Sequence, residues 1–446
     1  MADAMMIALA TLCTLLPFWI AQRQGLVRWV SPLHLLGYFC ALGFLAKVVA
    51  YAAAPDLAFY ARFDPAPGAG LRGAIYLGCF VVLICLGYVL ACTTSAAAAR
   101  VMAARGVAAG VQHIGLLAGI ALAVTALTML LILRARGASV GDAGVIEALN
   151  RSKQINVNAD GVGATLAGIK TLFVIPKFAF VLCLAQMIVR PRTAMVVMTL
   201  ALAGALAGIA LVSGDRFELV ELAIYALATH AILGGRLGWR QVVLGCVTGA
   251  GIVLLSAYMT QLRLGEDGAV ILRQIIGSTY FLDINVAVMV TGHVEPAQLL
   301  LGQSYVWWGF GWVPRDLWPD KPAIDLGVFF KREVMGVATG GAFNVTGPGE
   351  AFINFGWAGL AVAPALGWTF RKGEAFLLDA RRTARWGAAF VYPVLFYPFV
   401  QACLQSSFSA YVVGAVAQLV LVIGIRALFI RRLRWRRVPT ERLTYA

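Results

Sequence analysis

Two short stretches place acids and bases inside apolar runs. In FELVELAIYAL, Glu218 and Glu221 are three residues apart, so a helix presents them on one face. In GIKTLFVIPKFAF, Lys170 and Lys177 are seven residues apart and share a face in the same way. Charges in an apolar run are costly, so they usually pair with one another or serve function. Two interpretations stay open: a structural ion pair between these lysines and glutamates, or direct contact with a ligand.

A third stretch, VPRDLWPDKP, combines rigidity with charge. It holds three prolines, two acids and two bases in ten residues, and its candidate binding residues are Arg315, Asp316, Trp318, Asp320 and Lys321. Proline fixes the backbone and so positions neighbouring side chains at low entropic cost. An arginine fork binds a diphosphate bidentately, and a tryptophan stacks on a sugar ring or lies in an interfacial aromatic belt. We therefore predict that this stretch contacts substrate.

Glu350 and Asn354 lie in GPGEAFINFGWAGL, where glycines and a proline precede an apolar helix. Two interpretations of Glu350 stay open: it caps its own helix, or it takes a proton from a substrate hydroxyl at the water–lipid boundary. A further base, Arg151, lies in the polar loop 134–164. Basic patches close to buried carboxylates suit an anionic, lipid-linked substrate, because arginines bind its diphosphate and a carboxylate activates a sugar hydroxyl.

The elements that must position these residues are membrane helices. Hydrophobic residues make up 61% of the 446 residues, charged residues 13%, and the mean hydropathy is +0.83. These values exclude an ordinary soluble domain. About 20 apolar residues cross the hydrocarbon core. By that criterion we predict one polytopic, all-α membrane domain over residues 1–446 with about eleven spans, at 4–21, 32–54, 74–94, 114–133, 165–189, 194–213, 217–233, 240–259, 351–370, 387–405 and 410–430.

Basic residues set the predicted orientation. The net charge is +15, and the tail 431–446 begins with RRLRWRR directly after the last span. This is typical of a cytoplasmic end, as is the basic segment 371–386. Anionic lipid headgroups explain both clusters better than nucleic acid does. With the tail inside, the N-terminus and the loops 134–164 and 261–350 are expected outside, and both loops are expected to be functional.

The stretch 269–291 is apolar enough to suggest a further span. Arg273, Asp283 and Asn285 interrupt it, and charges at the middle of a bilayer are costly. We therefore expect an interfacial helix, or one enclosed in the loop 261–350, rather than a twelfth span. The eight cysteines and four histidines show no metal-ligand spacing, so we expect no metal and no cofactor.

PRDLWPDKP followed by GPGEAFINFGWAGL resembles the last external loop of the Wzy-type O-antigen and exopolysaccharide repeat-unit polymerases. Upstream, SGDRFEL is similar to an element that opens an interior helix in that family, and residues 213–360 carry the resemblance. It implies a GT-C-like glycosyltransferase of the bacterial inner membrane, active at the periplasmic face. Such an enzyme moves a growing chain from undecaprenyl diphosphate onto a hydroxyl of the incoming lipid-linked unit, without metal. A chain-length regulator protein is the implied partner.

The resemblance implies roles for individual residues. Arg216 and Arg315 are expected to stabilise the departing diphosphate, and Glu350 to accept the proton. The expected substrate-binding residues are Arg151, Lys170, Lys177, Glu218, Glu221, Asp316, Trp318, Asp320, Lys321 and Asn354.

Two other functions stay open. One is an O-antigen ligase-type glycosyltransferase, which carries an external-loop histidine near its arginines. His293, in TGHVEP, is the candidate for that residue. The other is a lipid-linked oligosaccharide flippase or another transporter. A flippase is expected to have two related halves and short loops, and we find no internal repeat in this chain.

Overall fold

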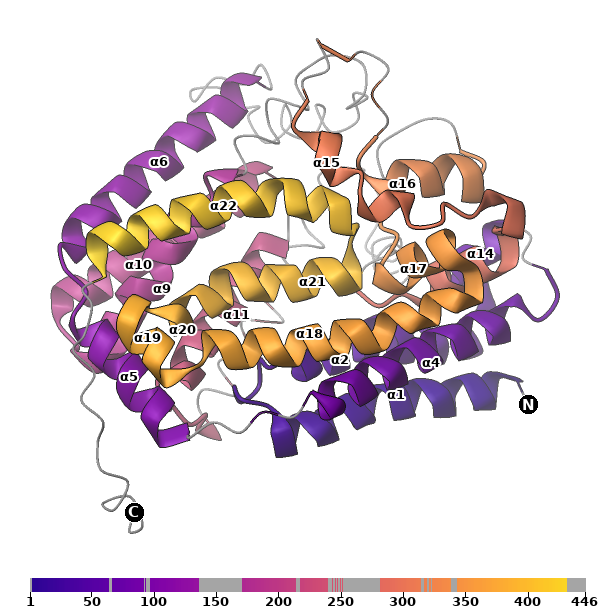
Figure 1. Ribbon diagram of the computed structural model, residues 1–446, viewed down its shortest axis with the longest axis horizontal. Helices are drawn as coiled ribbons and strands as arrows, with labels where there is room; N and C mark the ends of the chain where they lie inside the picture. Colours follow the sequence, from indigo (N-terminus) through magenta and orange to yellow (C-terminus); the bar gives the residue numbers. More distant parts are fainter. Residues whose placement is uncertain are drawn as a thin grey trace.

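The chain is described by a computed structural model (Figure 1). The structure describes residues 2–63, 66–91, 93, 97–135, 171–213, 217–239, 281–313, 317–318, 321, 323–337 and 343–430, and single residues between 243 and 251.

The first half of the described chain is a series of helices. They are α1 (Ala2–Gln24), α2 (Pro32–Cys40), α3 (Ala46–Ala53), α4 (Ala69–Leu90), α5 (Ala97–Ala109), α6 (Ile114–Ala135), α9 (Val174–Val189), α10 (Thr193–Ser213) and α11 (Phe217–Ile232). A π-helical turn, Ala41–Leu45, joins α2 to α3, so that the two form one continuous apolar helix. The Ala-rich α5 forms between the predicted spans 74–94 and 114–133, where it buries Ala103, Ala104 and Val107.

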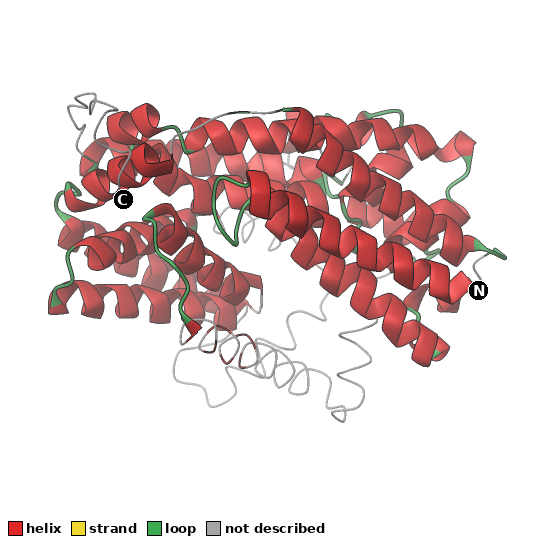
Figure 2. Cartoon of the chain, turned by 90° about the horizontal axis from the view of Figure 1, so that it is seen from below, coloured by secondary structure: helices red, strands yellow, loops and turns green. Residues whose placement is uncertain are grey.

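The second half contains shorter and more broken helices. They are α14 (Ile284–His293), α15 (Trp308–Gly311), α16 (Leu326–Phe329), α17 (Gly347–Phe355), α18 (Val362–Leu377), α19 (Ala380–Trp386), α20 (Ala388–Val391), α21 (Tyr397–Gln405) and α22 (Phe408–Phe429). A 3-10 turn, Gly356–Ala361, links α17 to α18, and a π-helical turn, Tyr392–Phe396, links α20 to α21. Figure 2 shows only helices and loops in the described part of the chain.

Eight described helices are long and apolar enough to cross a membrane. They cover Ala2–Gln24, Pro32–Ala53, Ala69–Leu90, Ile114–Arg134, Thr193–Ala210, Gly347–Leu377, Ala388–Gln405 and Phe408–Phe429. Each coincides with one of the eleven predicted spans. The other three predicted spans correspond to α9 and α11, of 16 residues each, and to 240–259, most of which lies outside the described residues. The prediction of an all-helical protein with several membrane-spanning helices is thus confirmed, while the count of eleven spans and the long external loop stay predictions.

The long helices lie side by side along the long axis of the molecule (Figure 1). One end gathers the N-terminus, α14, α16 and α17, and the other gathers α5, α19 and α20. At the contact of α4 with α18, a Cβ at Gly87 would overlap the carbonyl oxygen of Pro364, and one at Gly367 would overlap that of Ile84. The two helix backbones therefore touch without a side chain between them.

The expected interfacial helix within 269–291 is described only from residue 281 onward. There α14 is enclosed by α4 and α17, and its residues Ile284 to Val290 are all buried. Such an enclosed helix differs from one that rests on a lipid surface, and the helices that enclose it belong to the apolar segments Ala69–Leu90 and Gly347–Leu377. Its continuation Pro296–Tyr305 turns back at 108°, as in a broken span or a re-entrant loop.

Candidate functional site

The lysine and the two glutamates predicted to share a site do meet. Lys177 Nζ lies 2.6 Å from Glu218 Oε2 and 2.6 Å from Glu221 Oε2, and all three side chains are largely buried. The hydroxyl of Tyr225 donates to Glu221 Oε2 at 2.7 Å. The interpretation of an ion pair is therefore confirmed for Lys177, while Lys170 lies outside the described residues.

Helix geometry explains this cluster. Glu218, Glu221 and Tyr225 follow one another at intervals of three and four residues, so α11 presents them on one face. Lys177 lies in the first turn of α9, which packs against α11. The sequence reasoning missed Tyr225, although its spacing from Glu221 was a usable signal. The Lys177 ammonium is shared by two carboxylates, so these residues form a buried polar cluster between apolar helices.

Further buried polar groups lie on α21 and just after its end. Tyr397 packs edge-on against Tyr225, with ring centroids 6.3 Å apart. Its hydroxyl is buried and has no hydrogen-bond partner among the residues that the structure describes, and the same holds for Gln405 Oε1 and Ser407 Oγ. Buried polar groups in proteins are nearly always hydrogen-bonded, so three vacancies along one helix and its end are unusual. None of the three atoms is open to solvent, so a ligand would reach them only after the surrounding helices move apart.

The second centre surrounds Glu350, which is 1% exposed. Ser304 Oγ donates to Glu350 Oε1 at 2.8 Å, and the backbone N–H of Phe408 donates to Glu350 Oε2 at 2.9 Å. Asn354 Nδ2 donates to Ser304 Oγ at 2.7 Å. Within the described part of the chain, Glu350 forms no ion pair. A serine hydroxyl is therefore held between an amide N–H that donates to it and a carboxylate that accepts its hydrogen bond.

Local backbone features hold Glu350 in place. Thr346 precedes α17 with a φ of 62°, an uncommon value for a β-branched residue, and its hydroxyl accepts from the N–H of Gly349 at 3.4 Å. A Cβ at Gly347 would overlap the carbonyl oxygen of Cys403, so only glycine fits there. Thr346 thus caps α17, and Glu350 instead accepts from the first N–H of α22. The interpretation that Glu350 caps its own helix is wrong.

Asn354 also anchors the loop that covers Glu350. Its Oδ1 accepts from the N–H of Gly302 at 3.0 Å, and its Nδ2 donates to the carbonyl of Glu350 at 2.8 Å. Ser409 Oγ donates to the carbonyl of Ser304. Glu350 and Asn354, both predicted from GPGEAFINFG, therefore form one network with Ser304, which sequence reasoning missed because 46 residues separate it from Glu350.

Trp318 and Lys321, from the VPRDLWPDKP stretch, lie apart from these networks. Lys321 Nζ donates to the carbonyls of Val313 at 2.7 Å and Gly311 at 3.3 Å, so it closes its own loop. Trp318 is 40% exposed and meets Phe310 edge-on. The other predicted site residues lie outside the described residues: Arg151, Lys170, Arg216, Arg315, Asp316 and Asp320.

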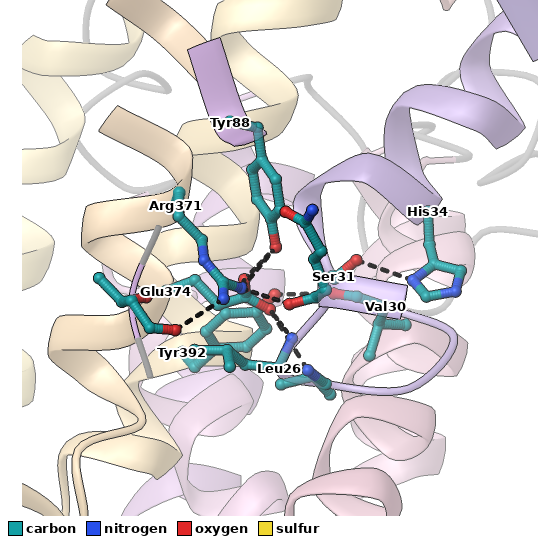
Figure 3. Close-up of polar contacts among 11 residues, drawn as sticks. Leu26, Val30, Ser31, His34, Tyr88, Arg371, Glu374 and Tyr392 are labelled. Carbon is teal, nitrogen blue, oxygen red and sulfur yellow. Dashed lines mark hydrogen bonds and ion pairs between the residues drawn. The ribbon is translucent and has the colours of Figure 1, made fainter. Parts of the chain in front are cut away.

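A third buried centre was not predicted (Figure 3). Arg371 is 5% exposed, and its Nη1 lies 3.4 Å from Glu374 Oε2, 3.2 Å from Tyr88 Oη and 2.5 Å from the carbonyl of Gln24. The explanation of the segment 371–386 by lipid headgroups is therefore wrong for Arg371. The available signal was the spacing of three between Arg371 and Glu374, which places opposite charges one helical turn apart.

A fourth centre pairs two helices that are far apart in sequence. Lys47 Nζ forms an ion pair with Asp283, which also caps α14 by accepting from the N–H of Asn285 at 2.8 Å. Asn285 Nδ2 donates to Tyr51 Oη at 2.7 Å. Asp283 and Asn285, which interrupt the apolar stretch 269–291, are therefore each bound to other buried groups. His293, the candidate ligase histidine, lies between the carbonyls of Met289 and Phe63, at 3.1 and 2.9 Å from its ring nitrogens.

Comparisons with known proteins bring no further identification. The chain matches no protein-family model, no curated protein and no solved structure.

Proposed function

We propose that this protein polymerises oligosaccharide repeat units linked to undecaprenyl diphosphate, at the periplasmic face of a bacterial inner membrane. The observation that carries this proposal is the hydroxyl held between Glu350 and Asn354. A general base needs its acceptor oxygen within about 3 Å of the proton that it removes. Ser304 Oγ meets this requirement, at 2.8 Å from Glu350 Oε1. We take Ser304 as the stand-in for the acceptor hydroxyl of a sugar.

The proposed reaction is a displacement at the anomeric carbon of the growing chain. The acceptor hydroxyl takes the place of Ser304 Oγ, Asn354 Nδ2 orients its oxygen, and Glu350 receives its proton. The acceptor oxygen forms the new bond to the anomeric carbon while the bond from that carbon to the diphosphate breaks, with its electron pair going to the diphosphate. Negative charge grows on the leaving group, where Arg216 and Arg315 stabilise it.

Two features of Glu350 support the role of a base. Both of its hydrogen bonds come from neutral donors, Ser304 Oγ and the N–H of Phe408. A carboxylate offers about four lone-pair sites, so two bonds leave capacity for a further proton. Within the described residues no cation neutralises it, and burial without a cation favours the protonated product of the reaction.

The polar atoms on α21 and just after it that lack a hydrogen-bond partner among the described residues support sugar binding beside this base. Tyr397 and Gln405 are eight residues apart, which separates them by about 12 Å along a helix. Ser407 directly precedes Phe408, whose N–H binds Glu350. A hydroxyl-rich ligand lying along α21 would form hydrogen bonds with all three unpaired atoms. Its terminal sugar would then lie next to Glu350. Tyr225, which donates to Glu221 in the Lys177 cluster, packs edge-on against Tyr397 and so helps to fix the position of its ring.

A deletion strain, complemented with the wild-type chain, tests the function. We expect loss of long polysaccharide chains while material with a single repeat unit remains. Purified protein in nanodiscs should then extend lipid-diphosphate-linked units into a ladder without added metal or nucleotide sugar.

Two outcomes would overturn the proposal. Complete loss of surface glycan with accumulation on the cytoplasmic side would identify a flippase. Intact polymer that fails to reach its final acceptor would identify a ligase.

A further inference from the structure

The segment that covers Glu350 carries an exposed apolar surface. Residues 296–313, with the sequence PAQLLLGQSYVWWGFGWV, contain no acid and no base, and the charged stretch around Lys321 follows them directly. Six large apolar side chains in and just after this run are exposed, and we call them the aromatic surface: Leu301, Val306, Trp308, Trp312, Leu317 and Trp318. Such a gathering of exposed apolar side chains is rare on a surface that faces water and marks contact with a membrane or with another protein.

The aromatic residues are held together around α15. Trp308 and Trp312 are four residues apart, at the first residue of α15 and just after its last, so they share one face. Trp318 packs edge-on against Phe310, with ring centroids 5.5 Å apart. Lys321 Nζ donates to the carbonyls of Gly311 and Val313, so the chain after α15 folds back onto it.

α15 rests on the side of α22. A Cβ at Gly311 would approach Cγ2 of Val413 to 2.5 Å, so glycine allows the short helix to lie close against the long one. Val413 is the sixth residue of α22, about 7.5 Å from its start at a rise of about 1.5 Å per residue. α15 therefore lies beside the first turns of α22 rather than beyond its end (Figure 1).

The face of α22 that α15 covers continues as a lipid-facing face. Val413, Val416 and Val420 follow one another at spacings of three and four, so they lie on one side of the helix. Val416 and Val420 are 46% and 64% exposed. α22 is long and apolar enough to cross a membrane, so these side chains lie where acyl chains run. The aromatic surface is thus continuous with a surface that meets lipid.

Exposed tryptophans also lie towards the C-terminal ends of two other candidate spans. The guanidinium carbon of Arg23 lies 4.1 Å from the ring centroid of Trp19, and Lys372 Nζ lies 5.8 Å from that of Trp368. Tryptophan is enriched where a membrane meets water, because its ring is apolar and its N–H is polar. α15 places two tryptophans at the opposite end of the long helices, where the second boundary of the bilayer is expected.

We propose that the aromatic surface lies in the head-group layer of the membrane, beside the first turns of α22, with Trp308 and Trp312 as its anchors. The run 296–313 would then be a membrane-contacting cover and not a loop in water. Ser304, whose hydroxyl donates to Glu350, belongs to the same run, so the Glu350 centre lies directly behind this contact with lipid. The proposal is independent of the polymerase activity.

Spin-label accessibility of the full chain tests this placement. A ketone-bearing residue introduced at Val306 or at Leu317 carries a nitroxide, so that the native cysteines stay in place. The protein is measured in nanodiscs of phosphatidylethanolamine and phosphatidylglycerol, with oxygen as the probe of the apolar layer and a nickel chelate as the probe of water. The ratio of oxygen to nickel collisions at both sites should be several-fold higher than at Arg332, an exposed residue of the turn Phe330–Val334, and should approach that at Val420.

A double variant tests the two anchors. Trp308→Ser with Trp312→Ser should raise nickel access at Val306 several-fold, because the cover loses its hold on the lipid. The matched control is Trp368→Ser, since Trp368 is 51% exposed, close to the 49% of Trp312, but lies on α18. It should leave nickel access at Val306 unchanged.

Two outcomes would overturn the proposal. Nickel access at Val306 and Leu317 equal to that at Arg332 would place the aromatic surface in water. Exclusion of both oxygen and nickel would show that a protein surface, from a second copy or another partner, covers it. Lipid-like collision ratios that persist in the double variant would remove the anchoring role from Trp308 and Trp312.

Discussion

Glu350 and Glu374 are two buried carboxylates in one apolar segment, Gly347–Leu377, yet their surroundings differ. Glu374 accepts from Tyr88 Oη at 2.5 Å and from the N–H groups of Leu26 and Val27 at 3.0 and 3.3 Å, and Arg371 neutralises it. Within the described ranges, the Glu350 carboxylate accepts from one hydroxyl and one backbone N–H.

These different surroundings indicate two different roles for a carboxylate that is costly to bury. Glu374 fills its acceptor sites with donors from α4, α18 and the turn between α1 and α2, so it joins these elements and has no acceptor site left. Glu350 keeps acceptor capacity and faces an exchangeable hydroxyl. A buried carboxylate paired with arginine is expected to stabilise the fold, and one without a cation to exchange a proton.

The largest effect is expected from Arg371→Ala. It leaves Glu374 as an uncompensated buried charge, which costs about 3–5 kcal/mol. The unfolding free energy in detergent should fall by that amount, with activity lost in proportion to folded protein. Lys372→Ala is the matched control, since the neighbouring lysine lies over Trp368, with its Nζ 5.8 Å from the ring centroid, and is in no ion pair with a described residue. Equal stability of the two variants would contradict a structural role for the Glu374 centre.

The next largest effect is expected from Glu350→Gln, and here on rate rather than stability. Gln keeps the shape and can still accept from Phe408, but it cannot take a proton. General-base catalysis contributes about 10²–10⁴-fold, so chain extension should fall by at least about 10²-fold while lipid-linked units still bind. The assay is a single-turnover extension in nanodiscs. Extension at the wild-type rate would remove Glu350 from the chemistry and direct attention to Glu218 and Glu221.

A smaller effect is expected from Tyr397→Phe. The hydroxyl has no partner in the described structure, so its loss should leave the unfolding midpoint unchanged or slightly raised. If it binds a sugar hydroxyl, the apparent KM for the lipid-linked unit should rise by about fivefold to tenfold, as for loss of one hydrogen bond. Tyr411→Phe is the control, since the Tyr411 hydroxyl already donates to the carbonyl of Leu395 at 3.0 Å. A pattern in which Tyr397→Phe only destabilises the fold would contradict the binding role.

The smallest effect is expected from Ser304→Ala. It removes the stand-in hydroxyl, so one N–H of Asn354 loses its acceptor and one oxygen of Glu350 loses its donor, at a stability cost of about 1 kcal/mol. Extension should stay within a few-fold of wild type, because the substrate hydroxyl takes that position. A loss of rate as large as that of Glu350→Gln would mean that Ser304 itself takes part in the reaction.

The sequence predicts the long helices well because the thickness of the bilayer fixes their apolar length. The predicted spans 32–54 and 114–133 agree with the observed Pro32–Ala53 and Ile114–Arg134 within a residue or two. The pairing of Lys177 with Glu218 and Glu221 was also predictable, since face spacing and the cost of buried charge both favour it.

The remaining centres depend on contacts that one sequence does not reveal. Lys47 and Asp283 are 236 residues apart, and Ser304 approaches Glu350 across the fold. Arg371 was misinterpreted for a different reason. A base at the end of an apolar run usually reaches the headgroups, and only the packing of α4 and α18 around Glu374 encloses it.

The backbone contact between α4 and α18 at Gly87 and Gly367 also constrains how the molecule moves. With no side chain between them, neither helix can slide or rotate on the other without a collision. The segment 296–313, in contrast, is held over Glu350 by hydrogen bonds of Asn354 and Ser409, by backbone hydrogen bonds of Leu300 and Leu301 to α17, and by ring contacts of Tyr305. Access to Glu350 is therefore expected to come from displacement of this segment, while α4 and α18 act as the stationary frame. Amide hydrogen exchange should be slow in that frame and faster in the segment.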